Sequence, residues 1–356
     1  MSIGKSGLSG IMLLLSVFLG ANGASAAEDY VIHLGYYNCD HMTAAPIAKD
    51  MGIFKQLGLN VEVIGNGKVP EAMAAGKMDV GYIGTEGLMQ AQIKGAPILI
   101  AANNHLGGAV YLVAANHIKT PKDLLGKKVA LGVDPEKTSS SWVNIALKLN
   151  LPLEGKKYET FKMSDKDEYL ALKTGKLDGM TTCDPWASMA EHEKTGHILG
   201  IEEKLPNGEW GSCCVFSMHR EFAAKHPELA KKMILAHSKA MQFIYTNPLR
   251  SAQIFAANYM VPEEVALMTI YKKTVAEGRT LTWEIDKRQI QDEIDFQLKV
   301  GTLTASPKMD ELVNMELLRE SGAEDFGKFI RAKVDPVFPL KMSYADWKKK
   351  VMARAL

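Results

Sequence analysis

The strongest constraint on the fold is a motif that the chain uses twice. One copy reads AMAAGKMDVGYIGTEG from Ala72 to Gly87, and the other reads ALKTGKLDGMTTCDPW from Ala171 to Trp186, 99 positions later. Each copy predicts one helical turn, a Gly, a short strand and a polar residue where the strand ends. Because ligands of open α/β sheets bind beyond the carboxyl ends of the strands, the two strand ends predict two facing sides of one site.

A second repeat covers a larger unit. Residues 31–54 and 128–151 align at an offset of 97, and each segment reads as a strand, a loop and a helix. Strands alternate with helices along the first half of the chain, which predicts a parallel-type sheet. An α/β fold of two similar lobes that face each other across a cleft is the simplest architecture that uses both repeats.

The N-terminus has the pattern of a secretory signal peptide. A single basic residue, Lys5, precedes the apolar run Ile11 to Leu19, and small residues follow at positions 24–27. The run is too short to span a bilayer, and a signal anchor is the alternative reading. We therefore expect residues 1–27 to be cleaved and the mature protein to be periplasmic.

Charge and cysteine content limit the partners. Removing residues 1–27 leaves 41 basic and 41 acidic residues, and a surface of zero net charge argues against a nucleic-acid partner. The four cysteines all lie in the mature part, where an oxidising compartment allows disulfides, and three full pairings are possible. Their spacing matches no zinc pattern, so no metal site is predicted. They are Cys39, Cys183, Cys213 and Cys214.

The second half of the chain is expected to return to the first lobe. Cys213 to Met218 reads as an apolar strand, and the chain from Ser251 onward reads as helical with interleaved charges. We expect these helices to pack around the first lobe without chemistry of their own. The predicted division is lobe 1 at 28–116, lobe 2 at 117–212, a return to lobe 1 at 213–258 and C-terminal helices at 259–356.

Several motifs, in this order and spacing, resemble the nitrate, sulfonate and taurine class of substrate-binding proteins of ABC importers. They cover most of the mature chain and include Gly35-Tyr36, Gly58 to Val61, Ala75 to Gly81, Lys94 to Ile98, Pro121 to Ala130 and His226 to Glu228. The resemblance implies a type II periplasmic-binding-protein fold with two hinge crossings, here near 114–119 and 210–214. It also implies capture of a small polar solute, transient delivery to a membrane permease, a monomer and no cofactor.

The ligand contacts that the resemblance implies fall on strand-end loops. A run of hydroxyl residues at a helix N-terminus can bind an anionic or acceptor group, although an N-cap explains any one of them equally well. The predicted ligand-binding residues are Tyr37, Asp40, His41, Gly67, Thr85, Glu86, Asn103, His105, Thr138, Ser139, Ser140, Ser141, Asp184 and Trp186.

The acidic positions depart from the pattern of sulfonate and taurine binders. Glu86, Asp184 and Asp40 bring up to three carboxylates to one cleft, and buried carboxylates require a cationic or N–H-rich partner. The expected solutes are a zwitterion, an amine, a sulfonate or an amide-bearing heterocycle, and the carboxylates count against nitrate, bicarbonate or a simple sulfonate. The alternative is that Glu86 and Asp184 cap their helices and face water.

Two other functions stay open. Pyrimidine synthases of thiamine biosynthesis resemble this family, but they are cytosolic and carry a longer Cys-rich motif than Cys213-Cys214, and no nucleophile–base pair is evident. A ligand-sensing partner of a membrane receptor has the same sequence features as a transport protein. We expect a non-catalytic binding protein.

Overall fold

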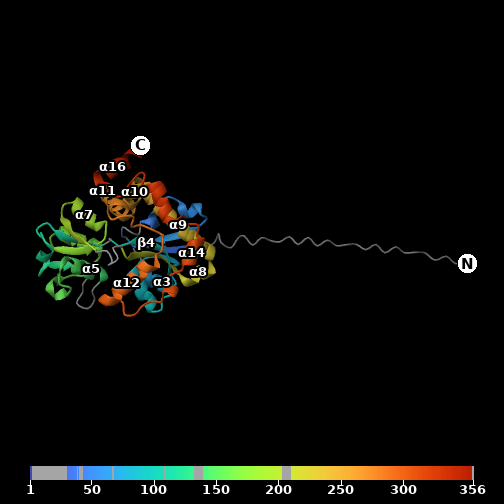
Figure 1. Cartoon of the computed structure of the whole chain (residues 1–356), viewed down its shortest axis with the longest axis horizontal. Helices are drawn as coiled ribbons and strands as arrows, with labels where there is room; N and C mark the ends of the chain where they lie inside the picture. Colours follow the sequence, from blue (N-terminus) through green and yellow to red (C-terminus); the bar gives the residue numbers. More distant parts are fainter. Residues whose placement is uncertain are drawn as a thin grey trace.

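A computed structural model describes residue 1 and residues 30–37, 39, 43–65, 68–107, 110–131, 139–202 and 210–354 (Figure 1). Apart from Met1, the expected signal peptide lies outside these residues, as do the predicted site residues Asp40, His41, Gly67 and Thr138. Within the described ranges, none of the helices combines the length and the apolar character that a bilayer-spanning segment needs.

The first lobe is built on a sheet with the strand order β2-β1-β3-β10-β4. β1, β2 and β3 run parallel, and β10 runs antiparallel to both β3 and β4. Most residues of β3, β4 and β10 are buried, as expected for strands that helices cover on both faces. The bounds are β1 (Val31–Gly35), β2 (Asn60–Ile64), β3 (Val80–Gly84), β4 (Ile98–Leu106) and β10 (Ser212–His219).

The second lobe repeats this arrangement in the order β7-β6-β8-β5-β9. β6 takes the place of β1, β8 takes that of β3, and β5 is the antiparallel strand that corresponds to β10. The two motif copies therefore contain equivalent strands, and the predicted fold of two α/β lobes is confirmed. The bounds are β5 (Tyr111–Ala115), β6 (Lys128–Ala130), β7 (Glu159–Thr160), β8 (Gly179–Thr182) and β9 (Gly196–Ile201).

The chain crosses between the lobes earlier than expected. β4 belongs to the first sheet and β5 to the second, so the crossing lies between Leu106 and Tyr111. The expected boundary at 116 and the expected crossing near 114–119 are wrong, because β5 is hydrogen-bonded to β8 and β9. The apolar run that forms β5 fits either sheet, and only its pairing partners distinguish them. The chain returns between Ile201 and Ser212.

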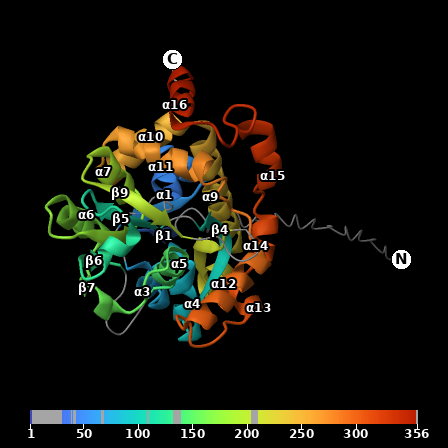
Figure 2. The same ribbon diagram turned by 60° about the vertical axis from the view of Figure 1, so that its left-hand side comes forward.

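Helices cover both sheets (Figures 1 and 2). Those of the first lobe are α1 (Ala44–Asp50), α2 (Ile53–Gln56), α3 (Val69–Ala74), α4 (Thr85–Ile93), α8 (Arg220–Lys225) and α9 (Pro227–Thr246). Those of the second are α5 (Ser140–Leu149), α6 (Asp165–Lys173) and α7 (Trp186–His192), with the short 3₁₀ turns η2 (Pro121–Leu124) and η3 (Gly155–Lys157). The remaining elements are α10 (Pro248–Tyr259), α11 (Glu263–Tyr271), η4 (Lys272–Ala276), α12 (Lys287–Val300), α13 (Met309–Leu312), α14 (Met315–Glu320), α15 (Phe326–Phe329), η5 (Ile330–Val334) and α16 (Tyr344–Ala353).

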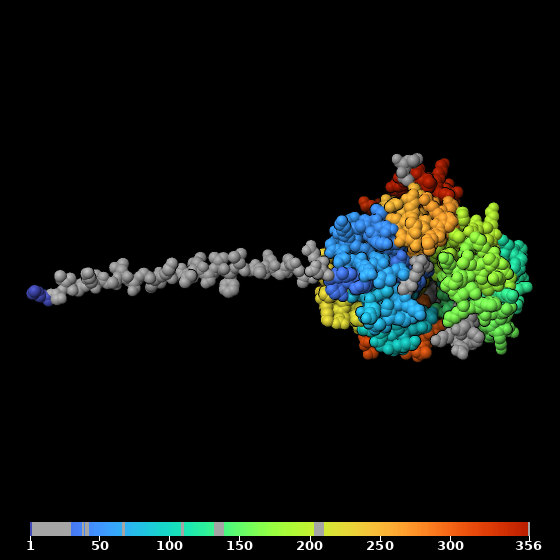
Figure 3. All heavy atoms as spheres, turned by 180° about the vertical axis from the view of Figure 1, so that it is seen from behind, coloured from blue at the N-terminus to red at the C-terminus, as the bar shows by residue number. Residues whose placement is uncertain are grey.

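The C-terminal helices contact both lobes, contrary to the expectation that they pack on the first lobe alone. α14 packs on α9 and β4 of the first lobe, whereas α11 packs on α7 of the second. Lys272, which follows α11, places its Nζ 3.5 Å from Oδ2 of Asp184 in the second lobe. Figure 3 shows the orange C-terminal helices above a hollow between the blue and green lobes. This region therefore forms a third link between the lobes.

Candidate functional site

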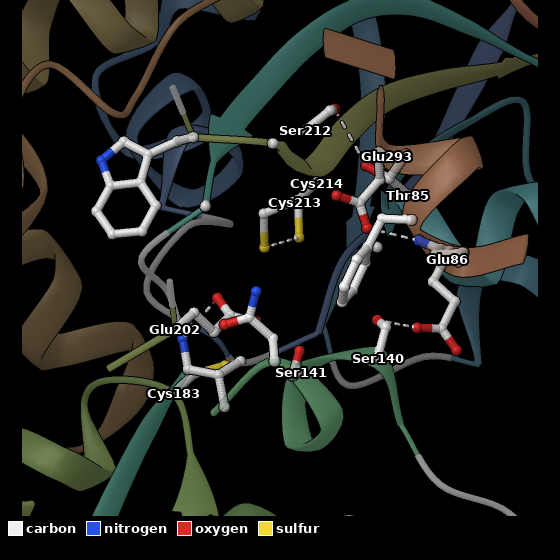
Figure 4. Close-up of a pocket in the computed structure, with 18 of the residues that line it drawn as sticks. Thr85, Glu86, Ser140, Ser141, Cys183, Glu202, Ser212, Cys213, Cys214 and Glu293 are labelled. Atoms are coloured by element: carbon white, nitrogen blue, oxygen red, sulfur yellow. Dashed lines mark hydrogen bonds between the residues drawn. The ribbon is translucent and has the colours of Figure 1, made fainter. Parts of the chain in front are cut away.

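A cavity of about 220 Å³, here called the inner cavity, lies between the lobes (Figure 4). Ser140, Ser141, Cys183 and Glu202 of the second lobe form one side of it. Its walls come from both lobes and from α12, and they consist of Tyr37, Gly84, Thr85, Glu86, Gly107, Val110, Ser140, Ser141, Asn144, Cys183, Glu202, Trp210, Gly211, Ser212, Cys213, Cys214, Glu293, Phe296 and Gln297.

Two helix N-termini meet at this cavity. α4 begins at Thr85 after the end of β3, and α5 begins at Ser140, with Ser139 as its N-cap accepting a 3.1 Å hydrogen bond from the Trp142 amide. Ser140 donates a hydrogen bond from its hydroxyl to Glu86, and this bond joins the lobes directly. The first amides of a helix have no partner within the helix, so both termini can donate to an acceptor group in the cavity.

A buried chain of hydrogen bonds orients the hydroxyl of Thr85. Ser212 donates to Oδ1 of Asn103 at 3.3 Å, so the 3.2 Å contact between Thr85 and Ser212 has Thr85 as donor. Behind them, Nε2 of His237 lies 2.8 Å from the Asn103 carbonyl and Nδ1 lies 2.9 Å from the Tyr82 hydroxyl. Burial lowers the pKa of His237 to about 4, so the ring is neutral and donates to the carbonyl through Nε2. The remaining hydrogen-bonding capacity of Thr85 is therefore that of an acceptor.

The inner cavity is acidic. Glu86 comes from the first lobe, Glu202 from the second and Glu293 from α12, and among the described residues no Lys, Arg or His lines the cavity. Burial raises the pKa of Glu293 to about 7, a hydrogen bond from Gln297 opposes this rise, and the charges of Glu202 and Glu86 add to it. An ionised Glu293 therefore needs a cationic or N–H-bearing partner.

Three thiols line the same cavity. Cys213 and Cys214 lie on β10 with their Sγ atoms 3.6 Å apart, and Cys183 follows β8 in the opposite lobe. Burial is the main cause of the raised pKa of Cys214, so its side chain is a thiol rather than a reactive thiolate. All four cysteines are described, and none forms a disulfide. In the described part of the chain, no three His, Cys, Asp or Glu side chains are arranged to hold a metal ion.

Aromatic side chains complete the walls. Tyr37 follows β1 of the first lobe, Phe296 lies on α12, and Trp210 lies where the chain returns from the second lobe. The Trp210 indole donates a 3.0 Å hydrogen bond to the Glu277 carbonyl, which fixes the ring against the C-terminal region. Such rings can stack on a ligand or face a cationic group.

The predicted site residues fall into three groups in the structure. Tyr37, Thr85, Glu86, Ser140 and Ser141 line the inner cavity. Ser139 lines an adjoining space of about 880 Å³, here called the outer chamber. The other described members, Asn103, His105, Asp184 and Trp186, line neither space.

Each of these four side chains has a structural contact instead. Asn103 supports Ser212, as described above, and Nε2 of buried His105 lies 3.1 Å from the Thr280 hydroxyl. Trp186 stacks on Tyr169 with ring centroids 5.7 Å apart.

Asp184 is fully buried and does not face water. It accepts hydrogen bonds from the amide and hydroxyl of Ser188 at 2.8 and 3.0 Å, and it is paired with Lys272. The expectation that Asp184 forms a side of the cavity is not met, because the C-terminal region occupies its far side. Asp184, which the repeated motif predicted as a ligand-binding residue, therefore belongs to the link between the C-terminal region and the second lobe.

Sequence reasoning missed the contribution of α12. Glu293, Phe296 and Gln297 line the cavity, although the C-terminal region was expected to have no role in the site. Their spacing places them on one face of a helix, but nothing in the sequence indicates what that face meets. Glu202 and Ser212 were also missed, and their positions at the ends of β9 and β10 were the available signal.

Comparisons with known proteins identify the family. A 183-residue stretch is 26% identical to the taurine-binding periplasmic protein of Escherichia coli K12, covering 51% of this chain and 55% of that protein, so the match spans about half of this relative. The nitrate-binding protein NrtA from Synechocystis PCC 6803 superposes with a TM-score of 0.66 at 18% identity, covering 91% of this chain and 98% of that one. The alkanesulfonate-binding protein SsuA from Xanthomonas axonopodis pv. citri, bound to MOPS, gives 0.62 at 19% identity, covering 80% and 96%.

These three relatives are binding proteins by name, and the two structures share the two-lobed fold of this chain. The resemblance to the nitrate, sulfonate and taurine class is thereby confirmed. A model of the NMT1-like family matches residues 25–257, which span both lobes. The chain belongs to the NMT1-like family.

Proposed function

We propose that this protein is the extracytoplasmic solute-binding component of an ABC importer, which captures a small polar solute between its lobes and delivers it to a membrane permease. The observation that carries the proposal is the position of the inner cavity, whose walls come from both lobes and are joined by the Glu86–Ser140 hydrogen bond. A solute held there favours the closed arrangement of the lobes, and a permease can recognise that arrangement.

The chemistry of the cavity supports binding rather than catalysis. Among the described lining residues there is no His to act as a base, and the buried Cys214 thiol has a raised pKa that disfavours the nucleophilic thiolate. The binding functions of the named relatives agree with this interpretation.

The solute that fits the cavity carries an ammonium or another N–H-bearing group. Glu86, Glu202 and Glu293 provide negative charge, while the N-termini of α4 and α5 provide amides for an acceptor oxygen. A zwitterion or a small amine satisfies these groups better than nitrate or a simple sulfonate does. The taurine-binding relative is consistent with this class, because taurine is itself a zwitterion.

Calorimetric titration of the mature protein tests the proposal. Taurine and butylamine carry an ammonium group, whereas isethionate replaces the ammonium of taurine by a hydroxyl. We expect the ammonium compounds to bind and isethionate to bind at least about tenfold more weakly, since a charged hydrogen bond contributes about 1.5–3 kcal/mol. Glu293→Gln should weaken the ammonium compounds selectively.

Asp295→Asn is the matched control, because Asp295 is exposed on the same helix and does not line the cavity. Binding unchanged in Glu293→Gln, or equal binding of taurine and isethionate, contradicts the assigned solute class. Failure of every solute to bind contradicts the function itself.

A further inference from the structure

The outer chamber adjoins the inner cavity. The two spaces share Glu86, Val110, Ser141 and Cys183 as walls, so a ligand in one can extend into the other. The outer chamber has a volume of about 880 Å³ against about 220 Å³ for the inner cavity. A solute that fills only the inner cavity therefore leaves most of the interlobe space to water.

One residue that lines the outer chamber carries a buried carboxyl group. Glu168, in the first turn of α6, is 6% exposed and lines the chamber. Its Oε2 atom is buried and has no hydrogen-bond partner among the described residues. Burial is the main cause of the rise in its pKa to about 9, and the charge of Asp165 adds to it. Buried polar groups are nearly always hydrogen-bonded, so this carboxyl requires an explanation.

The charges near Glu168 favour a nitrogen-bearing partner. The lysines that line the chamber, Lys94 and Lys162, are both exposed, and the charge that acts most on the Glu168 carboxyl is that of Asp165. An ammonium or amide N–H group can satisfy Oε2, and a cation there favours the ionised carboxyl. The inner cavity presents the same preference through Glu202 and Glu293.

We propose that the outer chamber is a second subsite, in which Glu168 binds the far end of an extended ligand that carries a nitrogen donor group at each end. One end lies in the inner cavity, and the linking atoms pass the shared walls at Val110 and Cys183. This inference rests on the proposed function, because it assigns the near end to the same acidic cavity. It makes the ligand longer than taurine or nitrate.

Two matched pairs of amines test the inference by calorimetry on the mature protein. Butylamine and 1,4-diaminobutane form the short pair, and octylamine and 1,8-diaminooctane form the long pair. Within each pair the carbon chain is constant, so the comparison isolates the second ammonium group. We expect at least one diamine to bind about tenfold or more tightly than its monoamine, since hydrogen bonds to charged groups are among the stronger ones.

Glu168→Leu should abolish this gain while leaving monoamine binding unchanged, and it should fold, because it replaces an unsatisfied buried carboxyl by an apolar group of similar size. Glu168→Gln retains a hydrogen-bond acceptor without the charge. If the diamine still binds more tightly than its monoamine in Glu168→Gln but not in Glu168→Leu, the contact is an N–H hydrogen bond that does not depend on the charge of the carboxylate. Glu159→Gln, an exposed acid on β7 of the same lobe, is the control and should behave as wild type.

The outcomes separate the two proposals. The second subsite is refuted, while the inner site stands, if monoamines bind and neither diamine binds more tightly than its monoamine. The same conclusion follows if the tighter binding of a diamine persists in Glu168→Leu. If no amine binds at all, the acidic inner site and the second subsite are both refuted.

Discussion

The third link between the lobes depends on a buried lysine. Lys273 is 1% exposed, and its Nζ donates to Oε2 of Glu277 at 2.8 Å and to the hydroxyl of Tyr111 at 3.0 Å. Tyr111 belongs to β5 of the second sheet and donates in turn to Glu277. A closed triangle of charged and polar groups thus joins the C-terminal region to the second lobe.

Lys273→Met removes the charge and keeps most of the apolar stem. Removing one partner of a buried ion pair costs about 3–5 kcal/mol, because the other charge stays buried without compensation. With a denaturant slope of about 3 kcal/mol per molar urea, the midpoint of unfolding should fall by about 1 M or somewhat more. Tyr111 can still donate to Glu277, which places the expected loss near the lower end of that range.

The loss of stability in Lys273→Met should also depend on pH. Burial raises the pKa of Glu277, and Lys273 opposes that rise, so the variant has the higher folded-state pKa. A carboxyl whose folded pKa lies above its unfolded value stabilises the fold fully below the unfolded pKa and loses that contribution as pH rises through the folded pKa. The loss of unfolding free energy in Lys273→Met, relative to the wild type, should therefore be smaller at pH 5 than at pH 8.

Urea titrations followed by circular dichroism measure these effects. Lys225→Met is the matched control, because Lys225 is also paired with a Glu four residues away but both side chains are exposed, so little change is expected. Adding Glu277→Gln to Lys273→Met should restore much of the stability, since no charge is then left alone. Equal midpoint shifts in Lys273→Met and Lys225→Met would refute the reasoning.

Two further predictions concern titrating groups. Glu293 has a folded pKa of about 7, above its ordinary value, so its contribution to stability is lost as pH rises from about 4.5 to 8. Glu293→Gln should reduce the change in the free energy of unfolding across this pH window by about 3 kcal/mol, as measured by urea titration at each pH. Parallel profiles of the wild type and the variant would contradict this. His237 has a folded pKa of about 4, below its unfolded value, so its contribution to stability is present above about pH 6.5 and is lost as pH falls. The NMR chemical shifts of its ring should therefore stay constant from pH 8 to 5. A titration midpoint near pH 6.5 would show instead that the ring is accessible to water.

Local patterns in the sequence predicted the lobes and one part of the site. The motif copies contain β3 and β8, which occupy equivalent places in the two sheets. Thr85 and Glu86 are the first two residues of α4, and Ser140 and Ser141 are the first two of α5, so their place at the cavity follows from where these helices begin. Such features depend on short stretches of chain, so periodicity and turn residues suffice to find them.

Contacts between distant segments decided the rest. Asp184 stands in the second motif copy as Glu86 stands near the end of the first, yet Lys272 approaches it from 88 residues later and takes it into the link between the lobes. Glu293 enters the cavity because α12 packs near β10 and α5, although its own helix reads like any amphipathic helix.

The sequence by itself thus determined which elements form and at which end of each strand polar groups gather. The tertiary structure alone decided which of those groups face the cavity, because burial and pairing depend on partners that lie far away along the chain. A carboxylate that meets a lysine becomes part of the framework, as Asp184 does. Glu293 and Glu168 instead line the spaces between the lobes, and we propose that they bind the ligand.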